Sequence, residues 1–268
     1  ENLELLNQLK DVDTAFAGWI NEVKAETIGL AHYYSKPIKQ PDQNNTETEL
    51  NLLTLKPSLW LDANEYNSTT GTWNDLSGNQ NYATRHASPK PKAHKNSSLQ
   101  VMRYHSKSND YHEFKEIRNI RTVFWVMSKT SGNSGSLLCH PSAHHFYSNG
   151  DKFWHPQHTH EHIRKGSLRI NGKEANAESN YPNKLAVISL RTTGDVIASR
   201  IGRDRNHGGK YNWNGEIGEV LIFSNALNDE QIKRVENHLI KKWKVKRESE
   251  IQYAKPMAYL SFDDRNGN

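Results

Sequence analysis

Histidine and aromatic side chains gather in one segment, HPSAHHFYSNGDKFWHPQHTHEHIRKG (140–166), which holds half of the fourteen histidines. Flat aromatic faces can stack on the C–H patches of sugars, while imidazole and amide groups can bond their hydroxyls. A glycan-binding surface is one interpretation of this segment, and an exposed loop without function is the other. The residues predicted to contact a glycan here are His144, His145, Tyr147, Trp154, His155 and His158.

A second cluster of the same residue types lies later in the chain, at GRDRNHGGKYNW (202–213). Its polar and aromatic side chains extend the predicted glycan site. Arg203 and Asp204 could instead form a structural salt bridge. The residues that we add to the predicted site are Arg203, Arg205, Asn206, Tyr211 and Trp213.

The sequence does not identify a metal site. His158, His160 and His162 alternate, so on a strand they would share one face, a geometry that can bind a transition metal. Oxygen ligands for calcium are the other possibility, although no dense acidic loop accompanies them. No cofactor is therefore assigned. The candidate calcium ligands are Asp62, Asn64, Asp75 and Asn79.

No catalytic residues are predicted. Cleavage of a glycosidic bond needs two carboxylates that flank it. Glu216 and Glu219 are three residues apart on an expected strand, so they should point to opposite faces. Cys139 has histidines nearby but no helix-start or oxyanion-hole signature. We therefore expect a binding protein and not an enzyme.

Composition favours a mainly β domain with polar loops, because only 34% of the residues are hydrophobic while seven Trp and eleven Tyr are present. The net charge of +5 is spread along the chain without a nucleic-acid-binding motif, so acidic partners such as sialylated or uronic-acid glycans are favoured over nucleic acids. The single cysteine excludes an intramolecular disulfide and fits a bacterial surface protein.

Hydrophobic spacing divides the chain into four parts. Residues 1–36 carry an apolar stripe at three- and four-residue steps, which predicts an amphipathic helix. Residues 37–50 read as a polar linker, 51–247 as a β domain, and 248–268 as a tail with one further strand over 257–262. No apolar run is long enough to cross a membrane, so membrane contact is expected only through a segment upstream of Glu1.

Within the β domain, local signals mark several elements. Strands are expected at 123–128, 167–172, 184–192 and 215–224, and Asn171-Gly172 predicts a hairpin turn. Asn228 is expected to cap a closing helix, with Gln231 completing a capping box. The inner stripe of that helix would be Ile232, Val235, Leu239 and Trp243.

Two separated stretches carry a family pattern, LWLDANEYNSTTGTWNDLSGNQNYAT (59–84) and IGRDRNHGGKYNWNGEIGEVLIFSNALNDEQIKRVENHLIKKW (201–243). Together they resemble the bacterial laminin-G-like, concanavalin A-like jelly-roll family over residues 55–245. The resemblance implies a two-sheet sandwich with a closing helix and a lectin-like function. It also implies that the 203–206 segment lies close to the histidine-rich loop, so that both form one site.

The N-terminal stretch ENLELLNQLKDVDTAFAGWINEV (1–23) resembles the exposed half of the first helix of type IV pilins. The two resemblances together imply a minor pilin that carries a lectin module, contacts other pilin subunits through residues 1–36 and acts as an adhesin at the bacterial surface. The alternative is a carbohydrate-binding module of a secreted polysaccharide-degrading enzyme. Neither resemblance identifies the glycan or the oligomeric state.

Overall fold

The computed structural model describes residues 50–86, 90–93, 98–105, 110–130, 132, 134–142, 145–205 and 211–246, without the side chains of 90–93 and 145. The chain divides into two units, Glu1–Thr48 and Glu49–Asn268, and every described residue belongs to the second. Three predicted parts lie outside the described residues. They are the N-terminal helix over 1–36, residues 37–49 of the linker, and the tail over 248–268 with its strand. No helix within the described ranges is long and apolar enough to span a membrane.

The described chain is mainly β, as the composition predicts. The strands are β1 (Leu59–Asn67), β2 (Thr72–Asp75), β3 (Ala83–His86), β4 (Lys90–Ala93), β5 (Gln100–Tyr104), β6 (Tyr111–Lys129), β7 (Ser136–Cys139), β8 (His145–Tyr147), β9 (Ser167–Ile170), β10 (Lys173–Ala175), β11 (Ala186–Ile201) and β12 (Gly215–Phe223). The helices are the 3-10 helix η2 (Leu52–Leu55), α2 (Glu161–Arg164) and α3 (Asp229–Lys242).

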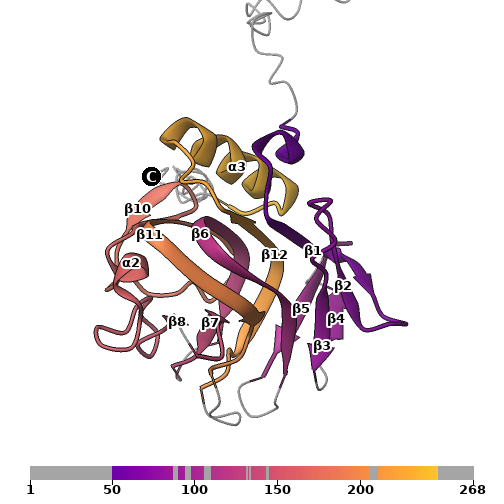
Figure 1. Ribbon diagram of the computed structural model, residues 1–268, viewed down its shortest axis with the longest axis horizontal. Coiled ribbons are helices and arrows are strands. Elements are labelled where there is room, and N and C mark those ends of the chain that lie inside the picture. The colour runs from indigo at the N-terminus through magenta and orange to yellow at the C-terminus, as the bar shows by residue number, and fades with distance from the viewer. Residues whose placement is uncertain are drawn as a thin grey trace, which may run out of the picture. The chain divides into compact units, whose positions relative to one another are not determined.

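In the described part of the chain, all strands join one antiparallel hydrogen-bonded sheet of order β10-β9-β11-β6-β3-β2-β1-β12-β5-β4, with β7 and β8 attached to β11. The long strand β6 pairs with β3 near its start and with β12 near its end. Three register shifts between Arg191 and Arg200 interrupt the pairing of β11 with β6. Such bulges bend strands, and both strands curve across the molecule in Figure 1.

Two hydrophobic cores lie on opposite faces of the central strands. Along β6, Val123 and Trp125 face the larger core, while Phe124 and Val126 face a smaller one under α3. The same alternation holds in β12, because successive side chains of a strand point to opposite faces. α3 therefore covers the outer face of β6, β11 and β12 (Figure 1).

The local predictions of the closing helix and of one hairpin turn are confirmed. Asn228 and Gln231 form the expected capping box, and all four residues of the predicted inner stripe are buried. Asn171 and Gly172 join β9 to β10 with φ of 51° and 81°, the left-handed pair that a tight hairpin turn requires.

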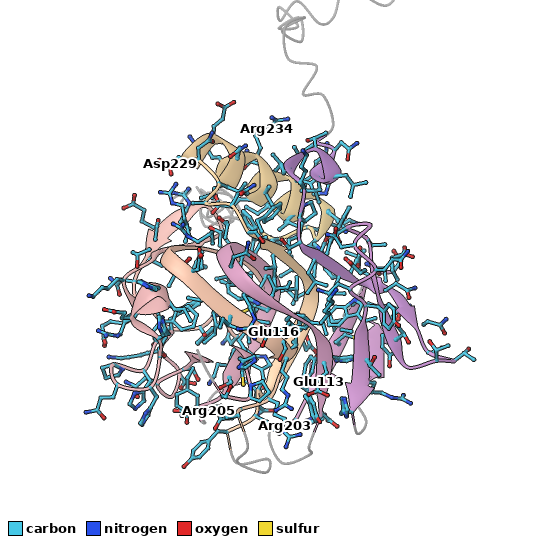
Figure 2. All side chains as sticks on the ribbon, viewed as in Figure 1. Glu113, Glu116, Arg203, Arg205, Asp229 and Arg234 are labelled. Atoms are coloured by element: carbon cyan, nitrogen blue, oxygen red, sulfur yellow. The ribbon has the colours of Figure 1, made fainter. Side chains whose placement is uncertain are left out.

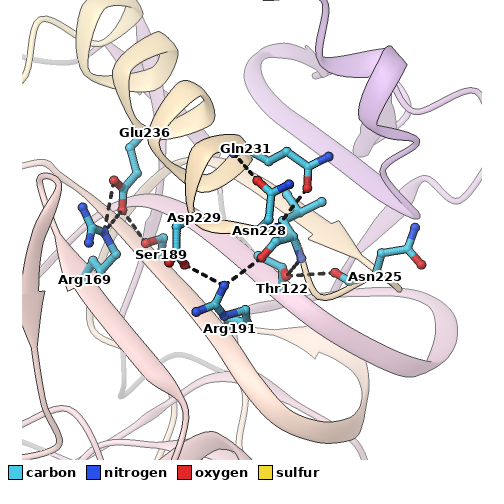
Figure 3. Close-up of polar contacts among 10 residues, drawn as sticks. Thr122, Arg169, Ser189, Arg191, Asn225, Asn228, Asp229, Gln231 and Glu236 are labelled. Carbon is cyan, nitrogen blue, oxygen red and sulfur yellow. Dashed lines mark hydrogen bonds and ion pairs between the residues drawn. The ribbon is translucent and has the colours of Figure 1, made fainter.

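Polar side chains fasten the first half of α3 to the sheet (Figure 3). Glu236 is only 1% exposed and accepts hydrogen bonds from Arg169 Nε at 2.9 Å and Ser189 Oγ at 2.6 Å. Near the N-terminus of the helix, Arg191 Nη1 lies 2.7 Å from Asp229 Oδ1 and also bonds the Leu227 carbonyl. Side chains of β9 and β11 thereby hold the N-terminal end and the middle of α3 against the sheet.

A buried carboxylate fastens the other end of α3. Glu219 is 0% exposed, and its two oxygens accept hydrogen bonds from Trp60 Nε1 at 2.7 Å and Trp243 Nε1 at 2.6 Å. Lys242 Nζ lies 2.8 Å from Glu219 Oε2 and 2.6 Å from Asp62 Oδ2. Burial raises the pKa of Glu219. Burial alone would lower the pKa of Lys242, but Glu219 and Asp62 outweigh it and raise that pKa.

We predict that Lys242→Met destabilises the fold by about 3 kcal/mol near neutral pH, because two buried carboxylates lose their cation. The pKa of Glu219 in the folded state should then rise further above its ordinary 4.5. A raised carboxyl pKa gives stability that is present below pH 4.5 and lost as the pH rises through the folded value. The loss should therefore be smaller at about pH 5 than at about pH 7.5.

Urea unfolding at both pH values measures this difference. Lys241→Met, at an exposed position of the same helical turn, is the matched control and should change stability by less than about 0.5 kcal/mol. Equal losses for the two variants would show that the buried network does not depend on the ammonium group.

Candidate functional site

Four aromatic rings from three segments form a cluster that we call the rim, made of Tyr147, His155, His158 and Tyr211. The ring centre of Tyr147 lies 5.8 Å from His155, 6.1 Å from His158 and 5.9 Å from Tyr211. His155 and His158 stack at 4.2 Å. His158 is exposed, and His155 and Tyr211 are half-buried, so the rim reaches the surface.

Backbone hydrogen bonds hold the rim in place. The Tyr147 carbonyl accepts from His155 N at 3.0 Å and from Thr159 Oγ1 at 2.6 Å, so the 155–159 turn folds back on β8. His155 Nδ1 accepts from the backbone N–H groups of Gln157 and His158. The neutral His155 ring therefore carries its proton on Nε2.

Burial shifts the pKa of the central rim residues in the direction of their neutral forms. It raises the pKa of the Tyr147 phenol to about 12. Burial, with a smaller effect of His158, lowers the pKa of His155. The neutral forms of Tyr147 and His155 are therefore favoured, and both can donate and accept hydrogen bonds to hydroxyls.

Arg203 and Arg205 flank Asp204, which is buried beside the rim. The backbone N–H of Asp204 donates to Asn212 Oδ1 at 3.2 Å, and Asn212 directly follows Tyr211 in the sequence. Figure 2 shows Arg203, Arg205 and Glu113 at one end of the molecule. Arg234, on α3, lies at the opposite end. Asp204 Oδ1 also lies 3.4 Å from Ser136 Oγ, and Ser136 pairs with Tyr147, so the described part of the 203–206 segment lies near the histidine-rich loop.

Two predicted contact residues do not fit a sugar-stacking role. Trp154 is 1% exposed and Trp213 is 0% exposed, and both belong to the larger core. Each contacts the ring of Tyr181, which also lies 6.0 Å from Lys129 Nζ. Both indoles therefore belong to the core, and neither offers a face to a ligand.

The remaining predicted contacts lie outside the description. His144 and Asn206 are not among the described residues. His145 is described only by its backbone, which pairs with Cys139. The members of the predicted site that the structure brings together are Tyr147, His155, His158 and Tyr211. The Arg203 guanidinium lies on Tyr111 of β6 instead.

His158, His160 and His162 do not lie on a strand, so the shared face considered for a metal site does not form. The segment forms a turn and then helix α2, in which His160 is the N-cap and its Nδ1 accepts from His162 N. His162 Nδ1 instead faces Thr193 Oγ1 at 3.0 Å. Within the described ranges, no three His, Cys, Asp or Glu side chains gather where they could hold a metal ion.

The four candidate calcium ligands are used to fix turns. Asp75 accepts from the backbone N–H groups of Trp60, Ser77 and Asn81. Asp62 accepts from Asn64, both backbone and side chain, and from Lys242. Asn79 donates to the carbonyl of Pro57. The polar atoms of these side chains therefore form hydrogen bonds within the first part of the β domain.

The face argument for Glu216 and Glu219 is wrong, because a register shift between Ile217 and Glu219 breaks the strand alternation. Their partners nevertheless differ. Glu216 forms an ion pair with Arg103, and Glu219 belongs to the buried network under α3. Two other carboxylates, Glu113 and Glu116, are each held in ion pairs, Glu113 with Arg200 and Glu116 with Arg118.

The sequence gives no signal for one arrangement beside the rim. The ring of Tyr111 stacks with His86 at 4.4 Å and 4°, and the guanidinium carbon of Arg203 lies 4.4 Å from the same ring. Glu113 pairs with His86 at 2.8 Å and with Arg200 at 2.6 Å. These residues come from β3, β6 and the end of β11, so only the sheet pairing brings them together.

No protein-family model matches the chain, and no curated protein matches it.

We predict that Trp154→Ala lowers the free energy of unfolding by about 3–5 kcal/mol, the usual effect of removing a buried aromatic side chain. Trp154→Phe should lose less, because it keeps an apolar ring. Thermal unfolding followed by circular dichroism measures both. An alanine variant as stable as the parent chain would contradict the placement of Trp154 in the core.

Proposed function

We propose that the chain is a glycan-binding adhesin, a minor type IV pilin whose β domain is a concanavalin A-like lectin module. The antiparallel strands, the shared inner core and the closing α3 support the jelly-roll sandwich. The pilin part of the proposal depends on the N-terminal resemblance alone, which lies outside the described residues.

The observation that carries the proposal is the rim. Its rings come from positions 147, 155, 158 and 211, and they meet at the surface. Sugar sites combine apolar faces for C–H patches with a few well-placed polar groups for hydroxyls. The rim supplies both kinds of group, held by backbone hydrogen bonds rather than by side-chain contacts alone.

Binding without cleavage is the second part of the proposal. A glycosidase needs one carboxyl group as an acid and another as a base or nucleophile. Among the described carboxylates, Glu113 is paired with Arg200 and His86, and Glu116 is paired with Arg118 and His140. Asp204, which is connected to the rim through Ser136, is buried and accepts a hydrogen bond from that serine.

Display on a filament gives the mechanism of attachment. A single site of a few rings binds weakly, and repetition along or at the tip of a pilus raises the effective concentration of sites. The extracellular bacterial surface is the location that this mechanism requires.

We predict that a glycan array identifies ligands of the purified chain and that Tyr211→Ala or His158→Ala weakens their binding about tenfold, which corresponds to about 1.4 kcal/mol. Tyr82→Ala is the matched control, because Tyr82 is a 55% exposed tyrosine outside the rim. Binding by biolayer interferometry should be unchanged in that control. The proposal would be overturned if the purified chain bound no glycan on the array, or if the rim variants bound as tightly as the parent chain.

A further inference from the structure

We propose that the rim selects anionic saccharides, whose carboxylate or sulfate group is bound by Arg203 and Arg205. This inference rests on the proposed glycan-binding function and names the class of its ligand. Three observations on the described residues carry it, namely the fixed position of one guanidinium, the lack of a carboxylate partner for the two arginines, and the connection of the 203–205 segment to the rim through Ser136.

The Arg203 guanidinium is held against a buried ring. Its carbon lies 4.4 Å from the ring centre of Tyr111, which is only 7% exposed. The Nε atom of Arg203 is buried and has no hydrogen-bond partner in the described structure. A guanidinium stacked on an aromatic face keeps its planar fork oriented, which is the arrangement that suits a bidentate oxyanion.

The charges around Arg203 and Arg205 are not balanced. Arg200 is neutralised by Glu113 at 2.6 Å, and its Nη1 donates to the Arg205 carbonyl at 3.0 Å. In contrast, neither Arg203 nor Arg205 forms an ion pair with a carboxylate in the described part of the chain. Asp204, which separates them, is 6% exposed and directs its backbone N–H to Asn212.

The 203–205 segment and the rim lie on neighbouring parts of the sheet. Asp204 Oδ1 accepts a hydrogen bond from Ser136 Oγ at 3.4 Å, and Ser136 pairs with Tyr147 across β7 and β8. The Arg203 guanidinium lies on Tyr111 of β6, so β11 and β7 separate it from Tyr147 of β8. A saccharide chain of several units can therefore place one ring on Tyr211 or His158 and an anionic group on a guanidinium.

Anionic polysaccharides and their neutral counterparts test the inference. Polygalacturonate against its methyl ester isolates the carboxylate, and dextran sulfate against dextran isolates the sulfate. We expect the purified full chain to bind at least one anionic member and to bind its neutral counterpart about tenfold or more weakly. Raising NaCl from about 0.05 M to about 0.5 M should weaken the binding.

Arginine variants separate a specific contact from general attraction. Arg203→Ala and Arg205→Ala should each weaken anion-dependent binding about tenfold, and Arg203→Lys should restore it only in part, because lysine lacks the planar fork. Arg234→Ala removes the same charge from the exposed face of α3, at the opposite end of the molecule, and should change nothing (Figure 2). Arg205 is exposed, so its variant remains informative if Arg203→Ala does not fold.

A positioning role for Tyr111 predicts that Tyr111→Phe retains binding while Tyr111→Leu weakens it.

Equal binding of neutral and anionic members would overturn the inference and leave the proposed function standing. Equal losses in the Arg203, Arg205 and Arg234 variants would also overturn it, because they indicate net charge alone. Failure to bind any saccharide would overturn both proposals.

Discussion

One buried carboxylate holds the outer layer of this domain to its sheet. Glu219 receives one indole N–H at each oxygen, from Trp60 in β1 and Trp243 at the end of α3. An amide in its place would direct an NH2 group at one of these donors, so the geometry requires a carboxylate. Because the buried charge then needs a cation, Lys242 is required as well, and β1, β12 and α3 become one unit.

Two of the strands that α3 covers also position the residues around Arg203. β6 and β11 run the length of the domain, with one end under α3 and the other near Arg200 and Tyr111. The register shifts of β11 lie in its second half, where the strand leaves the helix-covered region and approaches Arg203. Bulges change the direction of the side chains that follow them, so the position of the arginines depends on pairing far from the site.

Local signals allowed much of the fold to be predicted, while the site depended on contacts that the sequence does not reveal. The cap at Asn228 and the turn at Asn171 require only neighbouring residues, and both are confirmed. Trp154 is surrounded in sequence by polar residues that resemble a binding loop, yet its ring enters the core. The alternating histidines resemble a strand, but the 155–159 turn and the cap at His160 outweigh that pattern.

The core aromatics explain how a small rim could still bind a ligand selectively. Trp154 and Trp213 pack edge to face on Tyr181 in the larger core, and they are close in sequence to His155 and Tyr211, so folding of the core restricts these rim segments. A ligand then loses less free energy in ordering the site, since that entropy has already been lost in folding. Such preorganisation raises the affinity of a single site but does not increase the area of contact with the ligand. Firm attachment through the proposed site therefore still requires many copies that act together.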